Sequence, residues 1–264
     1  MKSSSKTSAY KALKYVTILG ININSTPKWQ LLDAVKNNLE KKIQFYIVTP
    51  NPEIVIQAQS DPDLTHSLNS ATFSLPDGIG LKFADKSLEI IKGRQFMLDL
   101  FALANTKKLK VYLLGSTKEV INKSLEKIEK EYPNINAKGN NGPILNNSAE
   151  PETEVYINLQ FEIVKEINSF KPDLLFVALG APKQEKWVAK WLPELKVTGA
   201  MVIGGSLDYY SGLVSPVPNL FATLGLEWFW RLIKEPSRIG RIVNATIVFP
   251  LKVIGAGKTK DSQN

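Results

Sequence analysis

Five short segments place small or polar residues directly after an apolar run, which is where α/β proteins often bind phosphorylated ligands. The segments are Thr49-Pro50-Asn51, Pro76-Asp77-Gly78, Gly115-Ser116, Gly180–Gln184 and Gly204-Gly205-Ser206. Most of them precede a predicted helix, and the amide groups at a helix N-terminus favour a phosphate. A single segment of this kind is ordinary turn chemistry. Five in one chain favour a nucleotide or another phosphorylated ligand.

Asp77 is the carboxylate best placed for acid–base chemistry. It follows Leu75 and Pro76 and precedes Gly78, so it lies where a strand ends and the backbone turns. A carboxylate at such a position can act as a general base. A structural alternative stays open at this point, namely that Asp77 caps the helix predicted to start at Ile79.

Several other polar residues have a structural explanation beside a functional one. Asp61-Pro62-Asp63 matches a known metal-binding Asp-x-Asp signature, but it follows a predicted helix, so a solvated turn is favoured. His66 is expected to be structural or exposed. Lys183 can pair with a diphosphate or be solvated at a helix start. Asp208 can bind a sugar hydroxyl or cap the turn before Tyr209.

The composition excludes several kinds of site. The chain has 264 residues, no cysteine and a single histidine. These counts exclude disulfides, thiolate metal sites, cysteine nucleophiles and multi-histidine metal centres, and they argue against a Ser-His-Asp hydrolase. Hydrophobic residues make up 44% of the sequence, so a packed core is expected rather than disorder.

Positive charge is concentrated at the two ends of the chain. The formal net charge is +8, and bases outnumber acids in residues 1–14 and 219–264 while residues 15–218 sum to zero. A neutral core with basic ends indicates contact with an anionic surface, either membrane or nucleic acid. No stretch reaches the roughly 20 apolar residues of a spanning helix, because polar residues interrupt Ile242–Ile254. The apolar run Tyr15–Ile23 is interpreted as a first strand rather than a signal peptide.

The five segments can meet only if the strands before them end at one edge of a sheet. Short β-branched or aromatic runs alternate with amphipathic stretches, which predicts parallel strands joined by helices. The predicted strands are Val16–Ile21, Gln44–Thr49, Thr72–Leu75, Lys110–Gly115, Asp173–Gly180 and Met201–Gly204. The predicted helices are Lys28–Lys41, Pro52–Ser60, Ile79–Asp85, Gln95–Asn105, Lys118–Tyr132, Glu154–Phe170 and Gln184–Trp191.

The predicted fold class is α/β, a Rossmann-like doubly wound and mostly parallel sheet with helices on both faces. Residues 136–151 are rich in Gly, Asn and Pro and are predicted to form an exposed loop. We expect three parts: a basic tail over 1–14, an α/β core over 15–218, and a basic, aromatic-rich, membrane-associating helical appendage over 219–264. Within the appendage, Trp228 is explained by packing or by the membrane interface, and Trp230 mainly by the interface.

Taken together, the motifs closely resemble those of the WecG/TagA/CpsF family of glycosyltransferases. The resemblance extends from about Val16 to Arg241, and the motifs follow the family's order. They are TPNPE at 49–53, LPDGIG at 75–80, Arg94 ahead of Asp99-Leu100, GAPKQE at 180–185 with Trp187, GGSLD at 204–208, and LEWFWRL at 226–232 followed by EPSR at 235–238.

The resemblance implies an inverting enzyme of the N-acetylmannosaminyltransferase type. Such an enzyme moves N-acetylmannosamine or a relative from a nucleotide diphosphate, UDP in particular, onto an undecaprenyl-diphosphate-linked acceptor for cell-surface polysaccharide or teichoic acid. Asp77 matches the catalytic base. The expected substrate-binding residues are Thr49, Asn51, Arg94, Gln184, Arg231, Arg238 and Arg241 from the resemblance, and Gly115, Gly204, Gly205 and Asp208 from the strand ends.

The resemblance also implies no metal ion and no other cofactor. The expected partners are the nucleotide-sugar donor, the lipid-diphosphate-linked acceptor and the anionic inner face of the cell membrane, with the protein peripheral on its cytoplasmic side. A homo-oligomer stays open, and nucleic acid is not expected. One departure from the family pattern is that Phe96 and Met97 replace a small polar residue and a glycine, which predicts a bulkier pocket wall.

Two other classes of function remain as alternatives. A nicotinamide-dependent oxidoreductase would carry Gly-x-Gly-x-x-Gly after the first strand, and the segment Gly20–Asn24 lacks it. A nucleic-acid-binding protein would use the basic ends, but the neutral core and the lack of a recognised binding motif argue against it.

Overall fold

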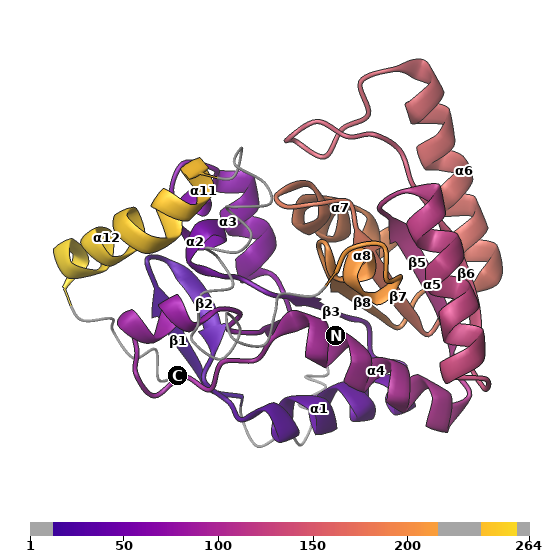
Figure 1. Ribbon diagram of the computed structural model, residues 1–264, viewed down its shortest axis with the longest axis horizontal. Coiled ribbons are helices and arrows are strands. Elements are labelled where there is room, and N and C mark those ends of the chain that lie inside the picture. The colour runs from indigo at the N-terminus through magenta and orange to yellow at the C-terminus, as the bar shows by residue number, and fades with distance from the viewer. Residues whose placement is uncertain (1–12, 216–238, 258–264) are drawn as a thin grey trace, which may run out of the picture.

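The computed structural model describes residues 13–215 and 239–257, and a parallel sheet lies at its centre (Figure 1). The strands of this sheet are β3 (Phe45–Val48), β4 (Phe73–Ser74), β5 (Lys110–Gly115), β6 (Asn136–Asn140), β7 (Leu174–Ala178) and β8 (Gly199–Val202). Their order is β4-β3-β8-β7-β5-β6, and every pairing is parallel. The α/β prediction is therefore confirmed.

The central strands are apolar because helices cover both of their sides. Every residue of β3, β7 and β8 is buried, as expected for strands of a parallel sheet. Gly199 begins β8 beneath the ring of Phe45, which a β-carbon at that position would overlap.

Two sets of helices form the outer layers. Helices α1 (Lys28–Lys41), α4 (Gly93–Lys107), α5 (Lys118–Glu131) and α8 (Ser206–Tyr210) pack on one face of the sheet. Helices α2 (Pro52–Ala58), α3 (Pro62–Asn69), α6 (Glu154–Phe170) and α7 (Lys183–Trp191) pack on the other. Short 3-10 helices η1 (Ile79–Phe83) and η2 (Leu192–Glu194) complete the connections.

Side-chain caps fix the starts of four helices. Asn51, Asp61, Thr117 and Thr153 each accept a hydrogen bond from the backbone amide three residues later. These bonds satisfy amides that the helix itself leaves unpaired. Helices α2 and α5 consequently begin within a few residues of the strand ends at β3 and β5.

The prediction of a single first strand over Val16–Ile21 in the parallel sheet is wrong. Strands β1 (Tyr15–Ile18) and β2 (Ile21–Asn24) instead form a separate antiparallel hairpin. Leu19 and Gly20 both have positive φ, at 47° and 81°, which suits a tight two-residue turn. The hairpin is tied to the sheet because the amide of Ser74 donates to Asn24 Oδ1 at 2.7 Å.

The predicted loop over 136–151 is wrong for its first five residues, which form β6. This strand is polar and partly exposed because it lies at the sheet edge and pairs only with β5. The apolar pattern of a buried strand is therefore missing. Gly139 permits the close approach of α5, since a β-carbon there would lie 3.0 Å from Ile121 Cγ2.

The described part of the appendage is one continuous helix built from α11 (Ile239–Val243), the π-helical turn η4 (Asn244–Val248) and α12 (Phe249–Ala256). It lies beside α2 (Figure 1), where Phe249 is fully buried. By length and composition alone these 18 residues pass as a candidate membrane span, although Arg241, Asn244 and Lys252 interrupt the apolar residues. Arg231, Arg238, Trp228 and Trp230 lie outside the described residues.

Candidate active site

The first half of the site, which we call the β3–β4 half, consists of the loops after β3 and β4 and the start of α4. The amide of Asp77 donates to the Pro50 carbonyl at 3.0 Å, and the Asp77 carboxylate accepts from the Gly93 amide at 3.3 Å. A β-carbon on Gly93 would lie 3.0 Å from Thr49 Cγ2 and 3.2 Å from Asp77 Oδ2. Thr49 and Asp77 therefore both lie against the first residue of α4.

The Asp77 carboxylate is held by a helix other than the one expected. Gly78 occupies the N-cap position of η1, and the bond to Gly93 places the carboxylate at the N-terminus of α4. Helix N-termini favour a negative charge. Asp77 is partly exposed, so a substrate hydroxyl can reach it, and the geometry is compatible with a base.

Asn51 has a structural role that limits how it can bind a ligand. Its Oδ1 accepts from the amide of Ile54 at 2.9 Å and caps α2, which leaves the amide nitrogen as the group able to donate. The η1 loop packs on the same helix start. A β-carbon on Gly80 would lie only 2.8 Å from Pro52 Cγ, so a glycine is needed for this contact.

The second half of the site, the β5–β8 half, consists of the loops after β5, β7 and β8. Gly115 and Ser116 both have positive φ, at 108° and 63°. A β-carbon on Gly115 would lie 2.5 Å from the Ala178 carbonyl carbon, so only glycine fits. Ser116 Oγ donates to Asp208 Oδ1 at 2.6 Å, which ties the loop after β5 to α8. A non-glycine residue with positive φ is uncommon and often marks a functional loop.

Gln184 connects α7 to the turn after β8. Its side chain is buried, Oε1 accepts from the Gly204 amide at 3.0 Å, and Nε2 donates to Glu185 Oε1 at 2.9 Å. Gly204 has a φ of 49°, and Gly205 leads into α8, where its β-carbon would lie 3.1 Å from Asp208 Oδ2.

Glu185 belongs to the GAPKQE motif but is not among the site residues predicted from the sequence. The side chain is 1% exposed, and burial raises the pKa of its carboxyl from 4.5 to about 7. The Gln184 bond and the positive charge of Lys186 oppose that rise in pKa, while the negative charge of Glu53 adds to it.

Arg94 connects the two halves. It follows Gly93 on α4, and its guanidinium carbon lies 5.3 Å from the ring centroid of Tyr209 on α8. A cation over an aromatic face is attracted by about 0.5–1 kcal/mol at exposed sites. Because Tyr209 follows Asp208, a chain of contacts runs from Asp77 to Ser116.

The C-terminal helix reaches the β3–β4 half through Arg241. Its Nε lies 3.6 Å from Glu53 Oε1, in a pair that is half exposed on the arginine side. Glu53 lies in the first turn of α2, two residues beyond Asn51. Arg241 is therefore near the predicted pocket, although its guanidinium is directed to a carboxylate of the protein.

Within the Asp-x-Asp pair the prediction of a solvated turn is wrong for Asp61, whose two carboxylate oxygens are both bonded, while Asp63 is exposed. Asp61 Oδ1 caps α3 at the Leu64 amide, 3.0 Å away, and Oδ2 pairs with the buried Lys186 Nζ at 2.7 Å. His66 is exposed on α3, as predicted. Within residues 13–215 and 239–257, no three His, Cys, Asp or Glu residues lie close enough to hold a metal ion.

Phe96 and Met97 do not line a pocket. Both are 0% exposed and pack in the core beneath α4 with Leu100 and Phe101. The predicted bulkier pocket wall is therefore wrong, because these two side chains point into the protein.

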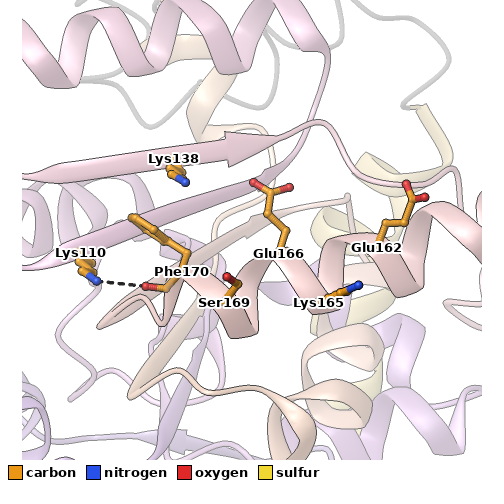
Figure 2. A pocket seen from close by; sticks show the side chains of 7 residues that line it. All are labelled: Lys110, Lys138, Glu162, Lys165, Glu166, Ser169 and Phe170. Carbon is orange, nitrogen blue, oxygen red and sulfur yellow. Dashed lines mark hydrogen bonds between the residues drawn. The ribbon is translucent and has the colours of Figure 1, made fainter.

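A hollow of about 470 Å³ lies elsewhere, between α6 and the strands β5 and β6. Figure 2 shows its lining, in which the Phe170 carbonyl accepts from Lys110. The Phe170 ring also lies 5.4 Å from Lys110 Nζ and 5.1 Å from Lys138 Nζ. Lys110 begins β5, so this hollow lies at the opposite end of that strand from Gly115. It contains no predicted site residue.

Glycine turns and capped helices lie at the carboxyl ends of these strands. In open α/β sheets such strand ends form nucleotide and phosphate sites, so the fold and site indicate an α/β protein that binds a nucleotide or phosphate group. The model of the glycosyl transferase WecG/TagA/CpsF family matches residues 16–263. The chain belongs to this family and is a glycosyltransferase. The prediction of a glycosyltransferase is confirmed. The two alternatives, an oxidoreductase and a nucleic-acid-binding protein, are therefore wrong.

The chain is also similar to individual relatives from Staphylococcus aureus. The N-acetylglucosaminyldiphosphoundecaprenol N-acetyl-beta-D-mannosaminyltransferase of strain MW2 is 32% identical over 240 residues, which cover 88% of this chain and 89% of the relative. The enzymes of the same name from strains NCTC 8325 / PS 47 and MRSA252 show the same identity and coverage.

Proposed function

We propose that the protein is an inverting hexosyltransferase that moves N-acetylmannosamine, or a close relative, from UDP onto an undecaprenyl-diphosphate-linked sugar. The product would enter cell-surface polysaccharide or teichoic acid. The observation that carries the proposal is the contact of Thr49 and Asp77 with the first residue of α4, in a chain whose relatives are named for this reaction.

In the proposed reaction Asp77 removes the proton from the acceptor hydroxyl. The acceptor oxygen then forms a bond to the anomeric carbon while the bond from that carbon to the diphosphate oxygen breaks. The electron pair of the broken bond leaves with the nucleoside diphosphate. Attack from the face opposite the leaving group inverts the anomeric centre, so an α-linked donor gives a β-linked product. A positioned base contributes about 10²–10⁴-fold to the rate.

The leaving diphosphate requires positive charge and hydrogen-bond donors. Arg94 lies between the two halves of the site and supplies a planar guanidinium that suits phosphate oxygens. The glycine turns after β5 and β8 lie at the same edge of the sheet and are proposed to border the diphosphate, while the Ser116 and Gly204 amides are bonded to the Ala178 carbonyl and to Gln184. Asp208 is proposed to accept from a hydroxyl of the donor. Arg231, Arg238 and Arg241 of the appendage are proposed to meet the two diphosphates.

We also propose that the helix Ile239–Ala256 lies in the plane of the membrane surface. Apolar side chains at a spacing of three or four residues are exposed along one face, namely Ile239, Val243, Ile247, Leu251 and Ile254. The other face packs on α2 through Phe249. A helix held to the protein along one side is suited to lie in the interface, with its free apolar side in the lipid.

Under this proposal the protein works at the cytoplasmic face of the cell membrane, where basic residues near anionic lipid contribute about 1 kcal/mol each. Leu251→Asp should weaken sedimentation with anionic vesicles. The matched control is Val155→Asp, which changes an exposed apolar residue of α6, far from α12 (Figure 1). Equal sedimentation of both variants would contradict the placement of the helix.

The reaction is tested by incubating the purified full-length protein with a panel of nucleotide sugars and a short-chain undecaprenyl-diphosphate-linked N-acetylglucosamine analogue. We expect transfer from UDP-N-acetylmannosamine or a relative, and a β-linkage in the NMR spectrum of the product. Retention of the donor configuration, or transfer from none of the donors, would contradict the proposal.

A further inference from the structure

We propose that Glu185 is a positioning residue for the transfer reaction, which holds the side-chain amide of Gln184 in the single orientation that fixes the glycine turn after β8. The inference rests on the proposed function, because the turn at Gly204-Gly205, to which Gln184 is bonded, is assigned there to the donor diphosphate. It adds a residue with no contact to the substrate, acting through its neighbour on α7.

The first step of the argument is the direction of the hydrogen bonds around Gln184. Its Oε1 accepts from the Gly204 amide at 3.0 Å and its Nε2 donates to Glu185 Oε1 at 2.9 Å. An amide oxygen can only accept and an amide nitrogen can only donate. Rotating the amide by half a turn would set Nε2 against the Gly204 N–H and Oε1 against the Glu185 oxygen. Glu185 and Gly204 together therefore permit one orientation.

The second step is what the fixed orientation controls. Gly204 has a left-handed φ of 49°, and the turn that it begins leads directly into α8 at Ser206. Helix α8 carries Asp208, which accepts from Ser116, and Tyr209, which lies beneath Arg94. Fixing the Gly204 amide therefore fixes the start of the helix that connects the two halves of the site.

The third step is that stability alone does not explain a carboxyl group at position 185. Its Oε2 is buried and has no hydrogen-bond partner among the residues that the structure describes. The charged groups that act on it are Glu53 of α2 and Lys186 of α7. Glu53 repels it and is itself paired with Arg241, while Lys186 donates to Asp61 and to the Asn147 carbonyl. A buried polar side chain with an unpaired oxygen is costly, so stability does not account for it. The feature that the positioning role uses is the oxygen that accepts from Gln184 Nε2.

The test compares two substitutions of similar size in the full-length protein. Glu185→Gln keeps an oxygen that accepts from Gln184, whereas Glu185→Met removes it. Each is also made together with Gln184→Met, which removes the side chain through which Glu185 is proposed to act. The measurements are kcat and KM for the donor, and NMR hydrogen exchange of the Gly204 amide. The Ser116 amide, which is bonded to the Ala178 carbonyl at 3.0 Å, serves as the internal control.

We expect Glu185→Gln to keep kcat/KM within about threefold of the wild type and to leave Gly204 exchange unchanged. Glu185→Met should lower kcat/KM for the donor at least about tenfold and speed Gly204 exchange by a similar factor, with Ser116 unaffected. In the Gln184→Met background the further change at position 185 should have little effect, because residues that act through one another are not additive.

Loss of activity in a folded Glu185→Gln variant would overturn the proposal, since the hydrogen bond survives there. A Glu185→Met variant with normal activity and normal Gly204 exchange would overturn it as well. If Glu185→Met does not fold, Gly204 exchange in the Gln184→Met variant decides instead, because exchange at the wild-type rate there would show that the Gln184 side chain does not hold the turn. Failure of the proposed function can be told apart from failure of this inference. In the first case the wild type would lack transfer activity, whereas hydrogen exchange of the Gly204 amide would still show whether Glu185 holds the turn.

Discussion

The two halves of the site differ in how their polar side chains are held. In the β3–β4 half, Asp77 is partly exposed and is bonded to the backbone amide of Gly93. In the β5–β8 half, buried Gln184 and Glu185 bond to each other, and Ser116 bonds to Asp208. The first half therefore presents a carboxylate that a reactant can reach. The second is a rigid set of turns whose side chains support one another.

This difference has a physical reason. A group that exchanges a proton with a substrate must be approached within hydrogen-bond distance, so it cannot be enclosed by the protein. A group that holds a phosphate must keep its amides aimed before the ligand arrives, and buried hydrogen bonds supply that rigidity. Substitutions in the two halves should therefore change different kinetic constants.

The largest effect is expected for Asp77→Asn. Asparagine keeps an oxygen for the Gly93 amide but cannot take up the proton, so kcat should fall by about 10²–10⁴-fold. Donor affinity and melting temperature should stay near the wild-type values. Steady-state kinetics and calorimetric donor binding check both parts.

The matched change in the other half is Asp208→Asn, which still accepts from Ser116 Oγ. It should raise KM for the donor and leave kcat largely intact. If Asp77→Asn kept near-normal turnover, or if both variants lost kcat alike, the division of roles between the halves would be wrong.

Truncation after Asn219 is expected to have the next largest effect. It removes Arg231, Arg238 and Arg241, and charge-assisted hydrogen bonds are worth about 1.5–3 kcal/mol each. Transfer to a soluble acceptor analogue should therefore fall about 100-fold or more. Nucleotide binding should survive, because all the strands of the central sheet precede that point. The melting temperature should drop, since the buried contact of Phe249 with the core is lost.

The truncated protein should also lose most of its sedimentation with anionic vesicles, and added salt should weaken the sedimentation of the full-length protein. Full transfer activity with unchanged sedimentation would remove both proposed roles of the appendage. Lost sedimentation with full activity would leave only the membrane role.

The sequence predicts the elements of the sheet best where burial imposes a pattern. Strand β5 and helix α6 have the predicted bounds, because an apolar run or an amphipathic period marks each. The hairpin was missed because its turn, Leu19-Gly20, interrupts a run that otherwise reads as one strand. Strand β6 was missed because an edge strand needs no apolar face. Helix α3 was missed because its polar residues Asp61 and His66 resemble a loop.

The candidate site could be predicted from the sequence where polar residues directly follow an apolar strand. It could not be predicted where only the packing of the fold shows whether a side chain is buried. Asp77 and Gln184 belong to the predicted strand-end segments, and Asp208 lies two residues beyond one of them. Glu185 has no such signal, since a glutamate in the first turn of a helix is usually solvated, and only packing shows that it is buried. Phe96 and Met97 were assigned to a pocket wall because the sequence does not show which side of α4 faces the core.

The third prediction concerns stability and pH, and it sharpens the contrast between Asp77 and buried Glu185. The pKa of the Glu185 carboxyl is about 7 in the folded protein against 4.5 when unperturbed. Between these values the folded state holds a proton that the unfolded chain has released, so the free energy of unfolding falls as pH rises from 4.5 to 7. Glu185→Gln should remove this contribution and stabilise the protein above pH 7, by up to roughly 3 kcal/mol.

Denaturant titrations of the wild type and Glu185→Gln at pH 5 and pH 8 give the comparison, because the other titrating groups cancel in the difference. The control is Glu194→Gln, which changes an exposed glutamate at the end of η2. Its free energy of unfolding should differ from that of the wild type by the same amount at pH 5 and pH 8. Equal pH dependence in the wild type and Glu185→Gln would show that the carboxyl is ionised at neutral pH despite its burial.

The smallest effect is expected from chelation, and the reason lies in the contacts of the Asp-x-Asp pair. A cation at Asp61 would have to displace both the Leu64 amide, which donates to Oδ1, and the Lys186 ammonium, which pairs with Oδ2 at 2.7 Å. Lys186 is buried, so losing its partner would leave an uncompensated charge, at a cost of several kcal/mol.

The diphosphate is instead proposed to meet Arg94 and the appendage arginines. Transfer should therefore be unchanged by EDTA, measured in the same assay with and without the chelator. Loss of activity that Mg²⁺ or Mn²⁺ restores would assign to a metal ion the positive charge that is proposed here for Arg94 and the appendage arginines.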